Sequence, residues 1–410
     1  MDTASSTEKI VKLDQGSIVS PKGFKADGLH SGVKKKRRDL GVIYCDTPAA
    51  SAGVYTLNKI QAAPLYVTKE SIAQEGLLQA IIVNSGNANS CTGEEGMRDA
   101  YKMREEGALA LGIPENRVAV TSTGVIGEKL DMEKIVPGIH QLKPQGAFSS
   151  ADQFNEAIMT TDIVKKHSCY QTEIDGKTVT FGGVAKGSGM INPNMATMLG
   201  FVTTDANIEP QYLQQALSEV TDQTFNRITV DGDTSTNDMV VVMASGHADN
   251  QTLHPGHSQW DTFIEALCKT SEDLSKKIAR DGEGATKLIE VNVRGAKNEV
   301  EAGKAAKQIA GSDLVKTAVY GTDANWGRII VALGYSEIEF KSGHNRYFIR
   351  KHSNTEEQYT YYVFGRRRQA LSRTGYSTDI CRSARRKRCW KAWGCDLTYE
   401  YVRINAGYRT

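Results

Sequence analysis

The chain lacks several features that would place it among membrane, zinc-binding or disulfide-rich proteins. It has no apolar run approaching the length of about 18 residues that a transmembrane helix needs. Its seven cysteines form no CxxC pair and no cluster with histidines, which indicates reduced thiols rather than a disulfide framework or a zinc site. The first residues show no basic stretch followed by an apolar one, as a signal peptide would. We therefore expect a cytoplasmic protein without a metal centre.

What is present is a globular composition, with 40% hydrophobic and 24% charged residues in a chain of 410. Period-two and helical patterns alternate along it, which predicts a mixed α/β fold: a layered α/β sandwich with mixed sheets. Strands are expected at 42–45, 52–57, 79–83, 117–120, 170–174, 178–181, 198–202, 239–243, 288–293 and 329–333, and helices at 93–111, 132–142, 151–160, 211–224, 263–274 and 304–309.

Three stretches carry candidate chemistry. A glycine-rich loop from Gly182 leads to Thr197, directly before an apolar strand, and such a loop can present a hydroxyl as a nucleophile. Many ordinary strands begin in the same way. Small residues at Thr123-Gly124 follow another strand and can aim backbone N–H groups at a developing oxyanion. Glu283 lies between two glycines, after a helical pattern and before a strand.

Five motifs, in this order, together resemble the ornithine acetyltransferase family of arginine biosynthesis, also called bifunctional glutamate N-acetyltransferase / amino-acid acetyltransferase. They are residues 122–127 (STGVIG), 186–191 (KGSGMI), 195–199 (MATML), 282–286 (GEGAT) and 403–406 (RINA). The resemblance extends over residues 10–340 and resumes at 392–410. Five motifs in sequence are far more specific than any single pattern.

The resemblance implies that the chain cuts itself between Ala196 and Thr197, giving an α-chain of residues 1–196 and a β-chain of residues 197–410. A threonine hydroxyl is a poor nucleophile, but an N-terminal threonine carries its own base, an α-amine with a pKa of about 7.7–8.0. This is an N-terminal-threonine nucleophile architecture. The implied reaction moves an acetyl group from N-acetylornithine to glutamate through an acetyl-threonine at Thr197, in two ping-pong steps.

The resemblance also assigns roles to other residues. Thr123 and Gly124 match the oxyanion-stabilising pair. The substrate-binding positions are Thr160, Lys186, Thr197, Glu283, Asn405 and Thr410. Lys186 suits an α-carboxylate and Glu283 an amino group, although Thr161 offers the same hydroxyl one position after Thr160. No tightly bound cofactor is implied, and the assembly is a heterotetramer of two α- and two β-chains. Some members use acetyl-CoA as a co-substrate, and the residues leave this open.

Residues 341–391 differ from their surroundings. They contain 14 Lys and Arg against 3 Asp and Glu, so they carry +11 while the remaining chain carries −9. One interpretation is a basic arm for nucleic acid or another anionic surface. We favour a second: two compensating frameshifts that replaced the native stretch, in which case its strands and packing are lost and activity is in doubt.

Two functional alternatives therefore stay open beside the acetyltransferase. The first keeps the architecture but transfers the acyl group to water, as an N-terminal-nucleophile amidase or aminopeptidase. The second is an inactive protein that binds anions through residues 341–391. In the favoured interpretation the partners are small molecules, with neither nucleic acid nor membrane among them.

Overall fold

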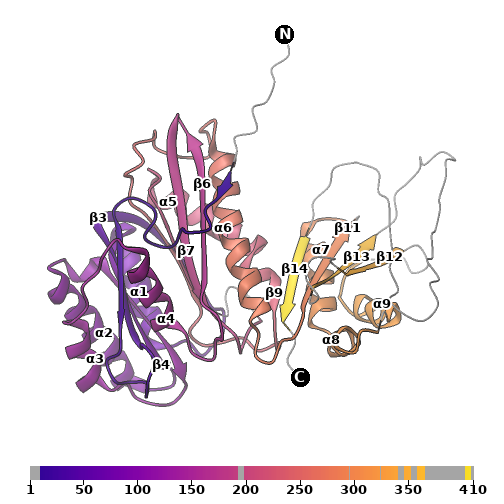
Figure 1. Cartoon of the computed structure of the whole chain (residues 1–410), viewed down its shortest axis with the longest axis horizontal. Helices are drawn as coiled ribbons and strands as arrows, with labels where there is room; N and C mark the ends of the chain where they lie inside the picture. The colour runs from indigo at the N-terminus through magenta and orange to yellow at the C-terminus, as the bar shows by residue number, and fades with distance from the viewer. Residues whose placement is uncertain are drawn as a thin grey trace, which may run out of the picture. The chain divides into compact units, whose positions relative to one another are not determined.

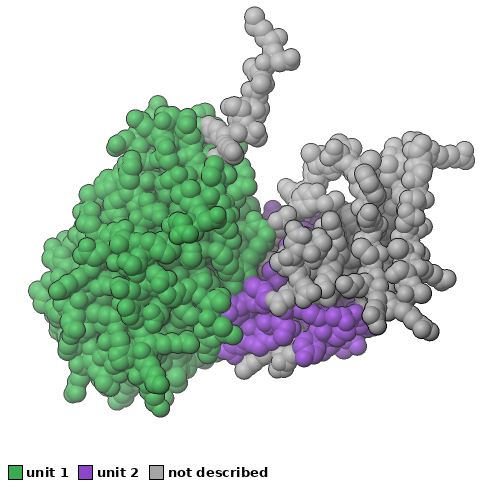
Figure 2. All heavy atoms as spheres, viewed as in Figure 1, with its two compact units in different colours: residues 1–226, 233–278 green, residues 227–232, 279–410 purple. Residues whose placement is uncertain are grey.

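The computed structural model describes residues 10–192, 198–294, 296–323, 325–339, 346–351, 358–364 and 402–407. The chain divides into two compact units (Figure 2). The first comprises residues 1–226 and 233–278, and the second residues 227–232 and 279–410. This division does not coincide with the expected cut between Ala196 and Thr197. The cut would divide the covalent chain rather than the compact units, and it stays a prediction.

The first unit consists of alternating strands and helices. In chain order they are β1 (Val11–Lys12), β2 (Phe24–Leu29), β3 (Leu40–Tyr55), α1 (Ala63–Glu75), β4 (Leu77–Asn87), α2 (Gly93–Leu111), the 3-10 helix η1 (Glu115–Arg117), β5 (Val118–Val125), α3 (Met132–Ile139), α4 (Phe148–Ile158), β6 (Lys166–Ile174), β7 (Lys177–Lys186), β8 (Leu199–Thr204), α5 (Pro210–Gln223), β10 (Met239–Ala244) and α6 (Trp260–Arg280). Two elements cross into the second unit: the 3-10 helix η2 (Phe225–Arg227) and α6, whose last two residues belong to that unit.

A mixed sheet organises this unit. Its strand order over the described residues is β1-β6-β7-β8-β10-β3-β4-β5, with β2 also paired to β3. The pairs β8–β10 and β4–β5 are parallel and the others antiparallel. Strand β7 runs antiparallel to β8, and β10 runs parallel to it. The end of β7 and the starts of β8 and β10 therefore lie together where these strands end, and we call this place an edge of the sheet. Leu199 accordingly pairs with Lys186 on one side and Met239 on the other.

Side chains that alternate along the strands supply two hydrophobic cores. On β4, Ile81 is buried in a core that includes Phe154 of α4. Its neighbour Ile82 is buried in a second core that includes Met103 of α2. Successive side chains of a strand point to opposite faces, so a strand covered on both faces is apolar almost throughout. The predicted layered mixed α/β fold is confirmed.

The helices pack on both faces of the strands. Helix α4 packs against β2 and β3, α1 and α2 pack against β5, and α5 packs against β3. Helix α6 runs beside the β6–β7 hairpin (Figure 1), where the rings of Phe181 and Phe263 lie 5.4 Å apart. In the described residues, no helix is both long enough and apolar enough to cross a membrane.

In its described residues, the second unit has a smaller sheet and three helices of its own. Its elements are β9 (Ile228–Thr229), β11 (Leu288–Arg294), α7 (Glu299–Gly311), α8 (Asp313–Tyr320), α9 (Trp326–Gly334), β12 (Arg346–Lys351), β13 (Gln358–Phe364) and β14 (Val402–Gly407). The strand order is β12-β13-β11-β14-β9. Helix α7 places Ala305 and Ile309 in one core with Ile289 and Val291 of β11.

Several expected boundaries are wrong. The strands expected at 42–45 and 52–57 are one long strand, β3, with an irregularity between Tyr44 and Ala49. The strand expected at 329–333 lies inside α9, because a short apolar run does not distinguish a strand from a buried helix. Helix α4 ends at Ile158 rather than 160. Helix α1 was not expected, since its apolar residues form no clear stripe.

Two strands lie within the basic segment 341–391. Strand β12 pairs with β13, and β13 pairs in parallel with β11. The expectation that strands are lost in this segment is therefore wrong for residues 346–351 and 358–364. The other residues of the segment lie outside those described, and the frameshift, which concerns the gene, stays a hypothesis.

Candidate active site

Thr123 and Gly124 lie at the carboxyl end of β5, where they pair with Ser85 and Gly86 of β4. Gly124 has a φ of +132°, a conformation that residues with a side chain rarely adopt. A Cβ at this position would also collide with the carbonyl oxygen of Gly86. Only glycine fits here, and the neighbouring Thr123 is buried. The expected oxyanion pair thus lies at a strand end with a backbone that other residues cannot form.

A buried amide fastens this strand end to the start of β10. The Asn237 side chain donates to the carbonyl oxygen of Ser122 at 2.8 Å and to that of Ala88 at 2.5 Å. Asn237 lies two residues before Met239, the first residue of β10. The ends of β4 and β5 are therefore held beside the edge at which β8 and β10 begin.

The expected nucleophile, Thr197, and its neighbour Ala196 lie outside the described residues. The next described residue is Met198, whose carbonyl oxygen accepts a hydrogen bond from the Met239 N–H at 3.1 Å. The strand that follows Thr197 in the sequence is thus flanked by the end of β7 and the start of β10. At this edge Lys186 ends β7, and Asp238 directly precedes β10.

Lys186, the last residue of β7, brings an ammonium group into this edge. Burial lowers its pKa, while the nearby carboxylates of Asp162 and Asp238 act in the opposite direction. The ammonium of Lys166 also lies close enough to lower it. A cation removed from water in this way interacts strongly with an incoming anion, because the local dielectric constant is low. Lys186 therefore suits the carboxylate of a substrate.

Asp162 joins two of the expected substrate-binding positions, although the sequence analysis did not single it out. One carboxylate oxygen, Oδ1, accepts from Lys166 Nζ at 2.6 Å and from the Gly187 N–H at 2.7 Å. The other, Oδ2, accepts from the Thr160 N–H at 2.9 Å. Although burial acts to raise its pKa, the nearby lysines and the hydrogen bonds lower it to about 2. Asp162 is thus an ionised anchor that fixes the backbone at Thr160 and beside Lys186.

Asp238 is a second buried carboxyl that was not expected. Burial raises its pKa well above the ordinary range, while Lys186 and the hydrogen bonds from Ser235 oppose this. Its Oδ2 has no hydrogen-bond partner among the described residues. The sequence feature that could have indicated Asp238 is its position directly before the apolar strand predicted at 239–243.

Lys34 is a third charged residue that was not expected. Its Nζ donates to the carbonyl oxygens of Met159 at 2.5 Å and Arg38 at 3.0 Å. Burial lowers its pKa to about 8, and the positive charges of Lys186 and Arg37 contribute to the shift. A run of basic residues normally indicates a solvated surface, so no sequence pattern places Lys34 at the site.

The remaining candidates belong to the second unit. Glu283 is partly buried in the loop between α6 and β11. Asn405 lies in β14, where its backbone pairs with Glu290 of β11 and Ile228 of β9. Thr410 lies outside the described residues. Their assignment as substrate-binding residues stays a prediction, as do those of Thr160 and Lys186.

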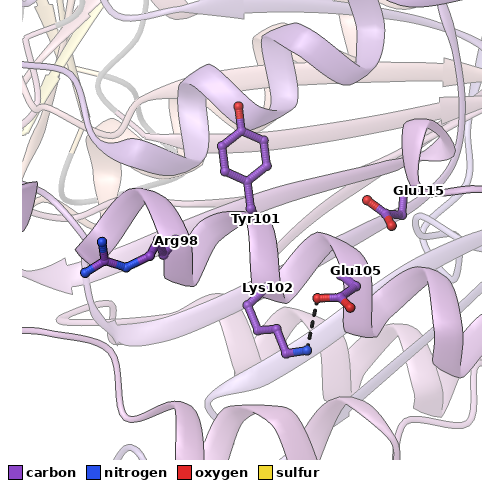
Figure 3. Close-up of a pocket in the computed structure, with 5 residues that line it drawn as sticks. All are labelled: Arg98, Tyr101, Lys102, Glu105 and Glu115. Atoms are coloured by element: carbon purple, nitrogen blue, oxygen red, sulfur yellow. Dashed lines mark hydrogen bonds and ion pairs between the residues drawn. The ribbon is translucent and has the colours of Figure 1, made fainter. Parts of the chain in front are cut away.

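A surface hollow of about 360 Å³ lies elsewhere, over α2 (Figure 3). Its lining residues are Arg98, Tyr101, Lys102, Glu105 and Glu115. Lys102 forms ion pairs with Glu105 at 2.9 Å and Glu106 at 2.8 Å, so neighbouring carboxylates of α2 neutralise its charge. None of the candidate catalytic residues lines it, and we assign it no part in the chemistry.

The described residues contain no group of three or more His, Cys, Asp or Glu side chains placed to hold a metal ion. Four cysteines in these residues are free thiols, and two of them, Cys45 and Cys169, are buried in the interior. The absence of a metal from the reaction stays a prediction.

Comparison with known proteins gives a consistent result. The ArgJ family model matches residues 25–410. The chain is 60% identical to the arginine biosynthesis bifunctional protein ArgJ of Halalkalibacterium halodurans, over 100% of both chains. The ArgJ protein of Geobacillus kaustophilus is 56% identical, again over 100% of both. A crystal structure of ornithine acetyltransferase from Mycobacterium tuberculosis, complexed with ornithine, matches at 36% identity and a TM-score of 0.43, covering 46% of this chain and 100% of that one.

Proposed function

Because the chain belongs to the ArgJ family, we propose that it carries an acetyl group from N-acetylornithine to glutamate in arginine biosynthesis. The observation that carries this proposal is the 60% identity to a named ArgJ protein over the full length of both chains. The resemblance inferred from the five sequence motifs is confirmed. The names of the relatives state a role in arginine biosynthesis, which favours acetyl transfer over the amidase or aminopeptidase alternative.

The first step of the proposed mechanism is internal. The Thr197 hydroxyl oxygen attacks the carbonyl carbon of Ala196, and the amide nitrogen leaves with a proton as the new α-amine of Thr197. Water then hydrolyses the resulting ester and releases residues 1–196. The α-amine next to the hydroxyl can then act as its general base, which a threonine inside a chain lacks.

In the transfer itself, Thr197 attacks the acetyl carbonyl of N-acetylornithine and its α-amine takes the hydroxyl proton. Thr123 and the Gly124 N–H bind the oxyanion, and such donors contribute roughly 3–4 kcal/mol each in other acyl-transfer enzymes. The C–N bond breaks, and ornithine leaves with the proton. Glutamate then attacks the acetyl ester through its amino group, and the Thr197 hydroxyl is restored.

The other proposed roles concern binding. Lys186 pairs with the α-carboxylate of either amino acid, and the Thr160 hydroxyl binds beside it. Asp162 supports both positions through its bonds to the Thr160 and Gly187 N–H groups. Glu283 binds an amino group, and Asn405 and Thr410 complete the set. We also infer a cytoplasmic heterotetramer of two α- and two β-chains without a tightly bound cofactor.

Intact-mass spectrometry followed by an activity assay tests the proposal. We expect two chains that meet between Ala196 and Thr197, and a single full-length chain in a Thr197→Ala variant. The assay measures N-acetylglutamate and acetate formed from N-acetylornithine and glutamate. Acetate alone would establish the amidase alternative, and an uncut, inactive wild-type chain would establish an inactive member of the family.

A further inference from the structure

The two halves of the candidate site lie far apart along the hydrogen-bonded sheet. Strand β4, which pairs with β5 and its oxyanion pair (residues 123–124), ends where β3 begins, since Asn84 pairs with Leu40. Strand β10 begins where β3 ends, since Met239 pairs with Tyr55. At about 3.3 Å per residue, a straight strand as long as β3 would separate the two places by roughly 50 Å. The strand ladder therefore joins them only through the whole length of β3.

Residues 234–238, which we call the brace, directly precede β10 and bond to the chain that follows β3. The Thr56 N–H donates to the Asp238 carbonyl oxygen at 2.9 Å. The Ala62 N–H donates to the Thr236 carbonyl oxygen at 3.0 Å. Backbone hydrogen bonds thus fix the brace at the end of β3, on the side of the site that holds Asp238.

The Asn237 side chain reaches from the brace to the end of β5. Its Nδ2 donates to the carbonyl oxygens of Ser122 and Ala88, at 2.8 and 2.5 Å. Its Oδ1 accepts from the Thr236 hydroxyl at 2.6 Å. Both N–H bonds and the oxygen of this buried amide are therefore used, and two carbonyl acceptors allow the amide only one orientation.

Ser122, the residue directly before the oxyanion pair, is also held from the β4 side. Its hydroxyl donates to Asn84 Oδ1 at 2.5 Å, and Asn84 Nδ2 donates to the Asn87 carbonyl oxygen at 3.0 Å. Ser122 and Asn84 are both buried. A buried polar network whose members are all bonded favours one arrangement of the backbone. Asn237 connects this network to the brace.

We propose that Asn237 is a positioning residue for acetyl transfer, which sets the place of the oxyanion pair relative to Lys186 and Asp238. Oxyanion donors act only where charge develops, and a misplacement of about 1 Å can lower a rate about a hundredfold. Lys186 lies on β7, and its neighbour Gly187 is anchored by Asp162 rather than by the amide of Asn237. This inference rests on the proposed function, whose oxyanion pair it concerns.

The variant Asn237→Leu tests the proposal in the full-length enzyme, because leucine has nearly the same size but cannot donate. We expect kcat for acetyl transfer to fall about 10–100-fold as the oxyanion pair moves. KM for N-acetylornithine and KM for glutamate should stay within about threefold, since Lys186 keeps its surroundings. Rates are taken per cut chain, measured by intact mass, so that slower maturation is not counted as slower transfer.

Asn250→Leu is the matched control, because Asn250 is a buried amide with the same kind of partners. Its Nδ2 donates to the carbonyl oxygens of Gln251 at 2.6 Å and Asn207 at 3.3 Å, and its Oδ1 accepts from the Asn207 N–H at 2.8 Å. It follows the carboxyl end of β10, whereas the site lies at the start of that strand. Asn250→Leu should lower stability in the same way and leave kcat unchanged.

Hydrogen exchange measured by mass spectrometry tests the position of the strand end without an activity assay. Peptides that cover residues 118–127 should exchange at least about threefold faster in Asn237→Leu than in wild type or Asn250→Leu. Should Asn237→Leu fail to fold, Thr236→Val takes its place, because it keeps the amide and removes only the hydroxyl bonded to Oδ1. This milder variant should lower kcat about two- to fivefold, again with unchanged KM values.

The opposite results overturn the proposal. Equal losses of kcat in Asn237→Leu and Asn250→Leu would reveal an effect of stability alone, and a raised KM with unchanged kcat would place Asn237 in substrate binding. If wild type and Asn237→Leu transfer acetyl at the same rate, this inference alone has failed. A wild-type enzyme that transfers no acetyl group would refute the proposed function and, with it, any role of Asn237 in transfer.

Discussion

The sharpest test of the described site is removal of the charge from Asp162, with Asp162→Asn. Asp162 and Lys166 are both fully buried and their charged atoms lie 2.6 Å apart. Asparagine has nearly the same shape and keeps one oxygen to accept from a backbone N–H, but it leaves the Lys166 ammonium buried opposite a neutral group. Breaking a buried ion pair in this way costs about 3–5 kcal/mol.

The lowered pKa of Asp162 gives a second figure for the same interaction. Its fall from 3.8 to about 2 means that the native surroundings prefer the carboxylate over the neutral acid. At about 1.4 kcal/mol per unit this preference amounts to roughly 2 kcal/mol. The folded pKa lies below the unfolded one, so this stabilisation is present above pH 4 and is lost as the pH falls through about 2.

Urea unfolding of wild type, Asp162→Asn, Lys166→Met and the double variant measures the pair. We expect the single aspartate variant to lose about 2–5 kcal/mol and the double variant to lose less, because no unpaired charge then remains. The stability of Asp162→Asn should also depend less on pH between 4 and 2 than that of wild type. A loss below about 0.5 kcal/mol, or a double variant as unstable as Asp162→Asn, would refute the assigned role of this carboxylate.

Three further substitutions test neighbouring positions. Gly124→Ala should lower stability by about 1–3 kcal/mol and reduce acetyl transfer at least tenfold. The control Gly127→Ala, which is also at positive φ but has free space around it, should lower stability alone. Equal losses of acetyl transfer in both variants would contradict the oxyanion assignment. Asp238→Asn should change stability by less than about 1 kcal/mol, because burial already favours the neutral form of this carboxyl. A loss as large as that of Asp162→Asn in the same urea assay would show that Asp238 is ionised. Lys186→Met should raise KM for N-acetylornithine and for glutamate by roughly 10–100-fold, because each substrate carboxylate loses a charged hydrogen bond. Unchanged KM values in steady-state kinetics would exclude Lys186 as the residue that binds the carboxylate.

Part of this site could be predicted from the sequence because its chemistry depends on local pattern. Gly124 follows a strand and is flanked by small residues, and its φ of +132° explains why glycine stands there. Lys186 and Glu283 could be chosen because their motifs resemble a known family. The fold class followed from the alternation of strand and helix patterns. The strand predicted at 329–333 was wrong because the length and composition of a short apolar run suit a strand and a short helix equally.

Asp162 and Lys34 could not be predicted, because their roles depend on burial and on partners distant in the sequence. An acidic residue four positions before a lysine, as in Asp162 and Lys166, is commonplace on solvated surfaces. Here both are fully buried. The β6–β7 hairpin brings Gly187 back beside them, and Asp162 accepts a hydrogen bond from its N–H. Residues 34–38 illustrate the same limit: five adjacent basic residues indicate a solvated turn, but the fold places Lys34 beside Gly86 and the Met159 carbonyl oxygen. The environment of such a charged run depends on the surface against which the fold places it, and strands far away in the sequence form that surface.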